Sequence, residues 1–221
     1  MRCIFCKNFC SEDKSVEHIV PESLGNVRHI LPIGAVCDRC NNYFSRKVEQ
    51  PLLASPMFRL LRAAVGVPNK RGTIPSWQPG DGTSLPDQRL MGRFLAKVGL
   101  EVLALRTLSV PKWNEHLVGQ AELDELRRFA RYNEGPDWPF TVRAIHPVNG
   151  VFEEGDGFFE VLHEFDLLMS ESSEIYLVIS LFGTEMVINL GGREIDGYGR
   201  WLVTNNGVSP LYSGKNAERI A

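Results

Sequence analysis

The spacing of apolar and polar residues predicts helices over the first two thirds of the chain. Residues 41–53 and 55–66 each repeat apolar positions with a helical period, and Pro56 marks the break between these two helices. A third amphipathic helix begins at Ala121 and ends at the Gly-Pro pair that follows it. The chain before these helices shows little helical period.

The strongest helical pattern covers residues 88–108. Asp87 precedes it and is of a residue type that caps helix N-termini. The apolar stripe is wide, so we expect this helix to be packed on more than one side. Its members are Met91, Phe94, Leu95, Val98, Val102 and Leu105. Residues 68–87, which are rich in Pro, Gly and Ser, are predicted to form a loop or linker.

After Pro139 the pattern changes to short apolar segments separated by Gly, Asn and Ser, which is typical of strands. The link between residues 175–181 and 186–190 has the composition of a hairpin turn. The predicted strands are 141–148, 158–169, 174–183, 184–191 and 200–205. We therefore expect an α+β fold with a helical middle and a C-terminal, mainly antiparallel β-sheet.

The composition is that of an ordinary globular protein, with 43% hydrophobic and 23% charged residues among 221. We expect an N-terminal module over residues 1–67, the linker 68–87, and a helical and β-sheet domain over residues 88–221. No apolar run reaches the roughly 18 to 20 residues of a membrane helix, and MRCIFCKN at the N-terminus lacks the apolar segment of a secretory signal. We therefore expect a cytoplasmic protein with reduced cysteines and no membrane partner.

The net charge of -3 is distributed unevenly along the chain. Residues 1–72 carry 11 Lys/Arg and 6 Asp/Glu, a net charge of +5, whereas residues 73–221 carry 13 and 21, a net charge of -8. A basic N-terminal third favours contact between a polyanion and that part of the chain. A chance fluctuation of a few charges between segments is the alternative explanation.

Four of the five cysteines form two CxxC pairs separated by 30 residues: Cys3 with Cys6, and Cys37 with Cys40. Two such knuckles complete a tetrahedral site of four thiolates, and a second knuckle that leads into a helix is typical of treble-clef zinc modules. No βαβ pattern accompanies either pair, which argues against a redox motif. We therefore predict a structural Zn²⁺ site, closed to catalysis. Cys10 is predicted to be a buried free thiol or a competing ligand.

The residues Glu17 and His18 lie between the two cysteine pairs, and Asn41 directly follows the second pair. The zinc framework brings these positions close together. Carboxylate and amide oxygens suit Mg²⁺ or Mn²⁺, and a neutral histidine beside them can take a proton from water. This combination indicates a site for phosphodiester hydrolysis.

The segments EHIVPESLGN (17–26) and VCDRCNNYFSRK (36–47) resemble the HNH endonucleases, whose ββα-metal motif often lies within a zinc module with two CxxC pairs. The resemblance covers about residues 3–53. It implies a zinc-bound ββα-metal module of the treble-clef type, a catalytic Mg²⁺ or Mn²⁺, and nucleic acid, with DNA favoured, as the substrate.

Carried over by position, the resemblance makes His18 the general base and makes Glu17 and Asn41 the ligands of the catalytic metal. Each residue has a simpler alternative role. His18 is otherwise a partly buried structural histidine, Glu17 a surface residue, and Asn41 the N-cap of a helix.

The middle Asn of the family motif falls near Pro32, which cannot serve, so Asn26 or His29 is expected to brace the loop instead. Arg46 and Lys47 follow on the helix beyond the site and are predicted phosphate contacts. As solvated surface charges, these two residues need no functional explanation.

The sequence thus predicts a metal-dependent HNH endonuclease, with defence against phage or mobile elements as the family-level role. The alternative is a catalytically weak or inactive zinc-dependent module that binds nucleic acid or protein. The acidic C-terminal region is expected either to bind a protein partner or form a homodimer, gating the nuclease, or to be purely structural.

Overall fold

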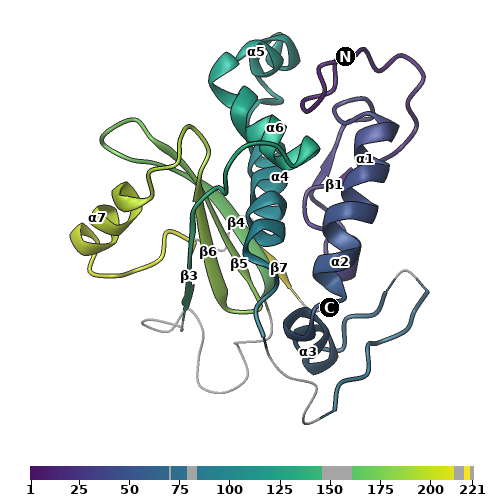
Figure 1. The fold of residues 1–221 in the computed structure, drawn as a ribbon, viewed down its shortest axis with the longest axis vertical. Helices are drawn as coiled ribbons and strands as arrows, with labels where there is room; N and C mark the ends of the chain where they lie inside the picture. The colour runs from purple at the N-terminus through teal and green to yellow at the C-terminus, as the bar shows by residue number, and fades with distance from the viewer. Residues whose placement is uncertain (70, 79–83, 146–160, 212–216, 220–221) are drawn as a thin grey trace. The chain divides into compact units, whose positions relative to one another are not determined.

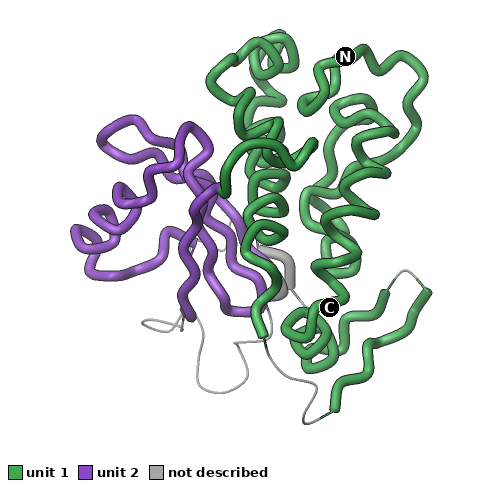
Figure 2. The backbone as a smooth tube through the Cα atoms, in the orientation of Figure 1, with its two compact units in different colours: residues 1–137 green, residues 138–221 purple. Residues whose placement is uncertain are grey.

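The computed structural model of the protein describes residues 1–69, 71–78, 84–145, 161–211 and 217–219. The chain forms two compact units, residues 1–137 and 138–221, which Figure 2 shows in green and purple. No helix among the described residues has the length and apolar character to cross a membrane. The domain boundaries at residues 67 and 87 stay a prediction, whereas the two units divide at Asp137.

The N-terminal part of the first unit contains a short ββα arrangement. Strand β1 (Glu17–His18) pairs with β2 (Ile30–Leu31) in antiparallel register, with Glu17 opposite Leu31. The 3₁₀ helix η1 (Glu22–Leu24) lies between the strands and ends at Gly25, whose φ of 90° suits glycine. Helix α1 (Asp38–Phe44) follows the second strand.

Helix α1 continues through a π-helical segment η2 (Ser45–Glu49) into α2 (Gln50–Leu53), so the three elements form one rod in Figure 1. Helix α3 (Pro56–Ala64) follows, with Pro56 at its first position, where the missing N–H costs nothing. The predicted helices over 41–53 and 55–66 are confirmed. The first one, however, begins at Asp38, because the second cysteine knuckle is itself the first helical turn.

The rest of the first unit is helical and packs around α4 (Gln88–Thr107). The side chain of Asp87 caps α4 by accepting a hydrogen bond of 2.9 Å from the backbone N–H of Leu90, as predicted. Helix α4 is buried over most of its circumference and contacts α5, α6, η2 and β2. The other elements are α5 (Trp113–Gly119), η3 (Ala121–Leu123) and α6 (Asp124–Tyr132).

The sequence pattern missed α5, which has only seven residues. Tertiary contacts hold it in place. The side chain of Asn114 accepts a hydrogen bond from the backbone N–H of Arg2 and donates one to its carbonyl, both at 2.8 Å. The start of α5 is therefore fixed to the N-terminal cysteine knuckle.

The second unit is an antiparallel sheet of strand order β3-β6-β5-β4-β7 with one helix. Phe182 and Gly183, with φ of 52° and 78°, form the two-residue turn between β5 and β6, which confirms the predicted hairpin. The strands are β3 (Phe140–Ala144), β4 (Val161–Met169), β5 (Ile175–Leu181), β6 (Thr184–Asn189) and β7 (Ala217–Arg219). Residues 146–148 and 158–160 of the predicted strands lie outside the described residues. The α+β fold class is confirmed.

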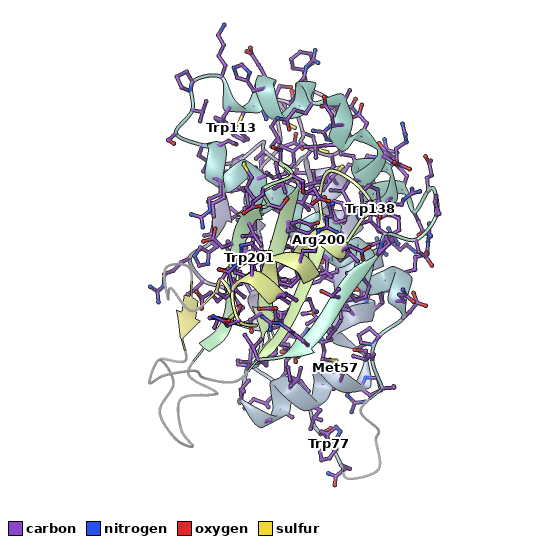
Figure 3. The ribbon with its side chains drawn as sticks, turned by 90° about the vertical axis from the view of Figure 1, so that its left-hand side faces the viewer. Met57, Trp77, Trp113, Trp138, Arg200 and Trp201 are labelled. Carbon is purple, nitrogen blue, oxygen red and sulfur yellow. The ribbon has the colours of Figure 1, made fainter. Side chains whose placement is uncertain are left out.

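The predicted strand over residues 200–205 is wrong, because this segment belongs to helix α7 (Asp196–Thr204). Tyr198, Trp201 and Leu202 lie three and four residues apart, so a helix places them on one face. That face packs on a cluster of buried sheet residues, and Figure 3 shows Trp201 on the helix. The cluster includes Tyr176, Val178 and Val187.

Candidate active site

The four cysteines of the two CxxC pairs form one cluster. The Sγ atoms of Cys3, Cys6, Cys37 and Cys40 all lie within 4.8 Å of one another, and no disulfide joins them. The Sγ atoms of Cys6 and Cys37 are 3.6 Å apart, close to the ~3.8 Å that separates thiolates around a tetrahedral zinc with bonds of about 2.3 Å. The donor set and its spacing therefore fit a structural Zn²⁺.

Local hydrogen bonds shape each knuckle. In the first, the backbone N–H of Lys7 donates to the carbonyl of Cys3 at 2.9 Å, and Lys7 takes a left-handed φ of 62°. In the second, the backbone N–H groups of Cys40 and Asn41 both donate to the carbonyl of Cys37 at 2.9 Å. Arg131 of α6 donates to the Sγ of Cys40 at 3.2 Å, which adds positive charge beside the thiolates.

The thiols of the cluster compete for protons because their sulfur atoms lie so close together. Hydrogen bonds with Cys3 and then Cys40 lower the pKa of Cys6 to about 2. Hydrogen bonds with Cys40 and then with Cys6, followed by burial, raise the pKa of Cys3. A cation between the sulfurs removes this competition, since it stabilises all four as thiolates.

We expect Cys37→Ser to unfold the N-terminal module, because the metal held by the four-cysteine cluster would link its two ends. Metal analysis of the parent should return about one zinc per chain, and circular dichroism should show lost structure in the variant. Cys10→Ser is the matched control. Cys10 lies outside the cluster, and burial raises the pKa of its thiol to about 12. A well-folded parent without zinc would contradict the assignment.

Hydrogen bonds of Asp38 and Asn41 attach the segment before β1 to α1. The carboxylate of Asp38 accepts a hydrogen bond of 2.8 Å from the backbone N–H of Ser15. Hydrogen bonding with the side chain of Ser15, and then with its backbone, lowers the pKa of Asp38. The side-chain amide of Asn41 donates to the carbonyl of Val16 at 3.0 Å. Because Val16 immediately precedes Glu17 and His18, these contacts hold both residues beside the start of α1.

A pocket of about 580 Å³ opens at this junction, within the first unit. Glu17, His18 and Asn41 all line it, so the structure brings the three predicted residues together. Ser45 and Glu49 extend the Asn41 face of the helix along the pocket. The remaining walls come from η1, from α2 and α3, and from Asn69, Arg71, Thr73 and Pro75.

His18 lies partly exposed in this pocket beside a carboxylate. Its Nε2 is 3.2 Å from Oε1 of Glu22, four residues later on η1. A carboxylate at this distance orients the imidazole and stabilises the imidazolium that forms when the ring takes a proton. The sequence did not predict this partner, because only the turn of η1 brings Glu22 back to the strand.

Asn41 lies inside α1 rather than at its N-cap, which is Cys37. The alternative role of Asn41 as a helix cap is therefore wrong. Since its Nδ2 is used by Val16, the side-chain oxygen is the atom with ligand chemistry.

Asn26 braces the loop between β1 and β2. It is fully buried, and its Nδ2 donates to the carbonyls of Val20 and His29 at 2.8 and 2.9 Å. Its Oδ1 accepts hydrogen bonds from the backbone N–H groups of Arg28 and His29. Of the two residues predicted for this task, Asn26 thus supplies the side chain, whereas His29 contributes backbone groups to the same network.

Glu17 is buried, with 5% of its surface exposed, and takes part in an ionic cluster. Nζ of Lys97, a residue of α4 with no exposed surface, lies 2.7 Å from Glu17, 3.0 Å from Glu49 and 2.9 Å from Glu101. The same ammonium donates to the backbone carbonyl of His18 at 3.0 Å. Lys97 therefore holds both residues of β1 in place.

The titration of the cluster reflects its burial. Burial raises the pKa of Glu101 well above its usual value and also raises that of Glu17, although Lys97 opposes both shifts. Burial would lower the pKa of Lys97, but the carboxylates of Glu101, Glu17 and Glu49 raise it well above its usual value. Lys97 therefore stays charged across the neutral range.

The predicted phosphate contacts Arg46 and Lys47 are exposed and do not line the pocket. The arginines that do line it are Arg59, Arg62 and Arg71. Sequence analysis missed these residues. Their signal was the basic charge of residues 1–72, but charge alone does not tell which side chains face a pocket.

Comparison with known proteins identifies the N-terminal segment. Residues 3–57 match the family model of the HNH endonucleases, so this segment of the chain is similar to an HNH endonuclease domain. The resemblance seen in EHIVPESLGN and the second CxxC pair is thereby confirmed. No curated protein and no solved structure matches the chain. The family implies nuclease activity on nucleic acid, and the four-cysteine cluster is compatible with structural zinc.

Proposed function

We propose that the protein is a metal-dependent endonuclease that hydrolyses phosphodiester bonds, with DNA as the favoured substrate. One observation carries the proposal: Glu17, His18 and Asn41 line one pocket inside the segment that matches the HNH endonucleases. By the resemblance to this family, these positions supply the general base and the ligands of the catalytic metal, although Glu17 stands where many relatives have aspartate and Asn41 where others have histidine. Defence against phage or mobile elements in the cytoplasm is the corresponding biological role.

The side chains of Glu17 and Asn41 would hold the catalytic Mg²⁺ or Mn²⁺. Oε2 of Glu17 supports this fit, because it is buried and has no hydrogen-bond partner among the described residues. A buried carboxylate oxygen of this kind suits a hard cation. When bound, the cation stabilises the negative charge that develops on the phosphate and on the leaving oxygen.

His18 would act as the general base. Its imidazole takes a proton from the attacking water while the water oxygen forms its bond to phosphorus and the bond to the leaving oxygen breaks. The carboxylate of Glu22 stabilises the resulting imidazolium, and the brace of Asn26 keeps the loop between the strands in shape. Arg46 and Lys47 would contact the backbone outside the pocket, which promises little sequence specificity.

The salt bridge between Glu17 and Lys97 favours the competing function, a zinc-dependent binding module without catalysis. It occupies Oε1 of the predicted metal ligand at 2.7 Å. In that case the basic N-terminal third would still bind nucleic acid, but no bond would be cut.

The two functions differ in a direct assay. Supercoiled plasmid, single-stranded DNA and RNA are each incubated with the purified protein and Mg²⁺ or Mn²⁺, with the His18→Ala variant in parallel. We expect metal-dependent nicking of at least one substrate by the parent only. Binding without cleavage under every metal condition would leave the binding module as the function.

A further inference from the structure

Arg62 is a buried cation that the rest of the pocket does not explain. It lies on α3, the helix that carries Met57 in Figure 3, and has 6% of its surface exposed. Its Nε and Nη2 atoms are buried and have no hydrogen-bond partner among the described residues. Arg62 is also one of the residues that line the pocket of the candidate active site.

Such an arrangement is expensive without a ligand. An arginine keeps its charge at every physiological pH, and burial of an unpaired charge is strongly unfavourable. Buried polar groups in folded proteins are almost always hydrogen-bonded. A substrate that brings a hydrogen-bond acceptor into the pocket removes this energetic cost.

Among the described residues, the acidic side chains that line the pocket form no ion pair with Arg62 and contact other groups instead. Glu17 and Glu49 form ion pairs with Lys97, and Glu22 lies beside His18. Arg59, one turn before Arg62, donates from Nη2 to the carbonyl of Ser76 at 2.9 Å. The two buried donors of Arg62 thus find no acceptor among the described residues.

We propose that Arg62 binds a phosphate of the substrate strand and so forms a phosphate subsite in the catalytic pocket. The inference rests on the proposed nuclease function. A phosphate offers two oxygens to the planar guanidinium fork, which matches the geometry that arginine binds best. Arg62 lies beyond residues 3–57, so this subsite is an addition from α3 to the matched HNH segment.

Arg62→Met tests the subsite, because methionine fills the space without charge or donors. Binding of two unrelated labelled oligonucleotides is measured by fluorescence anisotropy across a salt series, in the His18→Ala background so that no substrate is consumed. We expect affinity to fall about ten-fold or more for both sequences and the slope of log K against log salt to decrease by about one. Arg62→Lys should bind with intermediate affinity, since it keeps the charge but loses the fork.

Thermal unfolding separates this role from a structural one. Removal of an unpaired buried charge should leave the unfolding temperature unchanged or raise it, whereas loss of a structural arginine lowers it. Arg128→Met is the control, because Arg128 is exposed on α6 and lies outside the pocket. Arg128→Met should change neither the unfolding temperature nor the affinity for the oligonucleotides.

The outcomes distinguish the inference from the function on which it rests. If the parent nicks nucleic acid and Arg62→Met binds as tightly as Arg128→Met, the subsite is wrong and the nuclease function stands. If both Arg62→Met and Arg62→Lys unfold at lower temperature than the parent, Arg62 has a structural role and the subsite is also wrong. If the parent neither binds nor cuts any nucleic acid, both proposals fall.

Discussion

Replacement of His18 by alanine should reduce nucleic-acid cleavage roughly 100- to 10,000-fold, the contribution of a positioned general base. The fold should survive. The contact of His18 with Lys97 is made by the backbone carbonyl, which alanine keeps, and the zinc cluster uses other residues. Substrate binding should also survive, because the lost side chain carries no permanent charge.

A nicking assay at saturating Mg²⁺ or Mn²⁺ measures the loss, with zinc content and circular dichroism as checks on the fold. Glu22→Gln is the informative companion, since it keeps the size of the partner of His18 but removes its charge. Glu22→Gln should cost less activity than His18→Ala. It should also shift to lower pH the part of the pH–rate profile in which the rate rises as His18 loses its proton, because a neutral partner stabilises the imidazolium less. If His18→Ala cleaves nucleic acid as fast as the parent, the pocket is not the catalytic site.

Replacement of Lys97 by methionine should destabilise the first unit by about 3–5 kcal/mol, the usual cost of removing one partner from a buried ionic cluster. Methionine matches the length of the stem, so packing changes little. What it leaves is Glu17, Glu49 and Glu101 in close proximity without a cation. Cleavage should fall as well, since β1 loses the contact that holds Glu17 and the backbone of His18.

The pH dependence gives this prediction its sign. The folded-state pKa of Lys97 is raised, so its contribution to stability is fully present below about pH 10.5, the ordinary lysine pKa, and is lost as pH rises through the folded-state value. The folded-state pKa values of Glu17 and Glu101 are raised too, so any fold without Lys97 gains stability as pH falls and these carboxyls take up protons.

Urea unfolding of the parent and Lys97→Met at about pH 6 and about pH 8 measures both effects. The free energy of unfolding that Lys97→Met loses relative to the parent should be smaller at the lower pH, which still leaves the cysteine thiolates of the cluster intact. Adding Glu101→Gln should recover part of the loss, because it removes one uncompensated carboxylate. Lys47→Met, at an exposed lysine, should leave stability within about 0.5 kcal/mol of the parent. An equally small effect of Lys97→Met would mean that the cluster does not hold β1 in place.

Much of the site could be predicted because its information is local. A CxxC pair fixes two sulfurs on one knuckle through backbone bonds within four residues, so the spacing alone indicated the cluster of Cys3, Cys6, Cys37 and Cys40. The position of Asn41 directly after the last cysteine placed it on the first turns of α1. The same holds for the Asp87 cap and the Phe182–Gly183 turn, which depend on neighbouring backbone atoms only.

Local pattern failed where a short segment fits two structures. Residues 200–205 form a short apolar segment of the kind that fits a strand, but α7 forms because Tyr198, Trp201 and Leu202 cover the apolar sheet cluster together. The seven residues of α5 carry too few apolar positions to reveal a helix, and its contact with Arg2 spans more than a hundred residues. In both cases packing against a distant surface outweighs the local preference.

The sequence by itself indicated the four-cysteine framework, the α+β class and the trio of Glu17, His18 and Asn41, since each follows from local spacing or from the local apolar pattern. Only the tertiary structure decided which charges surround that trio. Lys97 lies 79 residues after His18 along the chain and reaches its carbonyl because α4 packs beside β1. Arg62 looks in sequence like any arginine on an amphipathic helix, and only its burial without a partner marks it as a candidate ligand for phosphate. Burial and pairing arise from the way distant elements pack, and no local spacing encodes them.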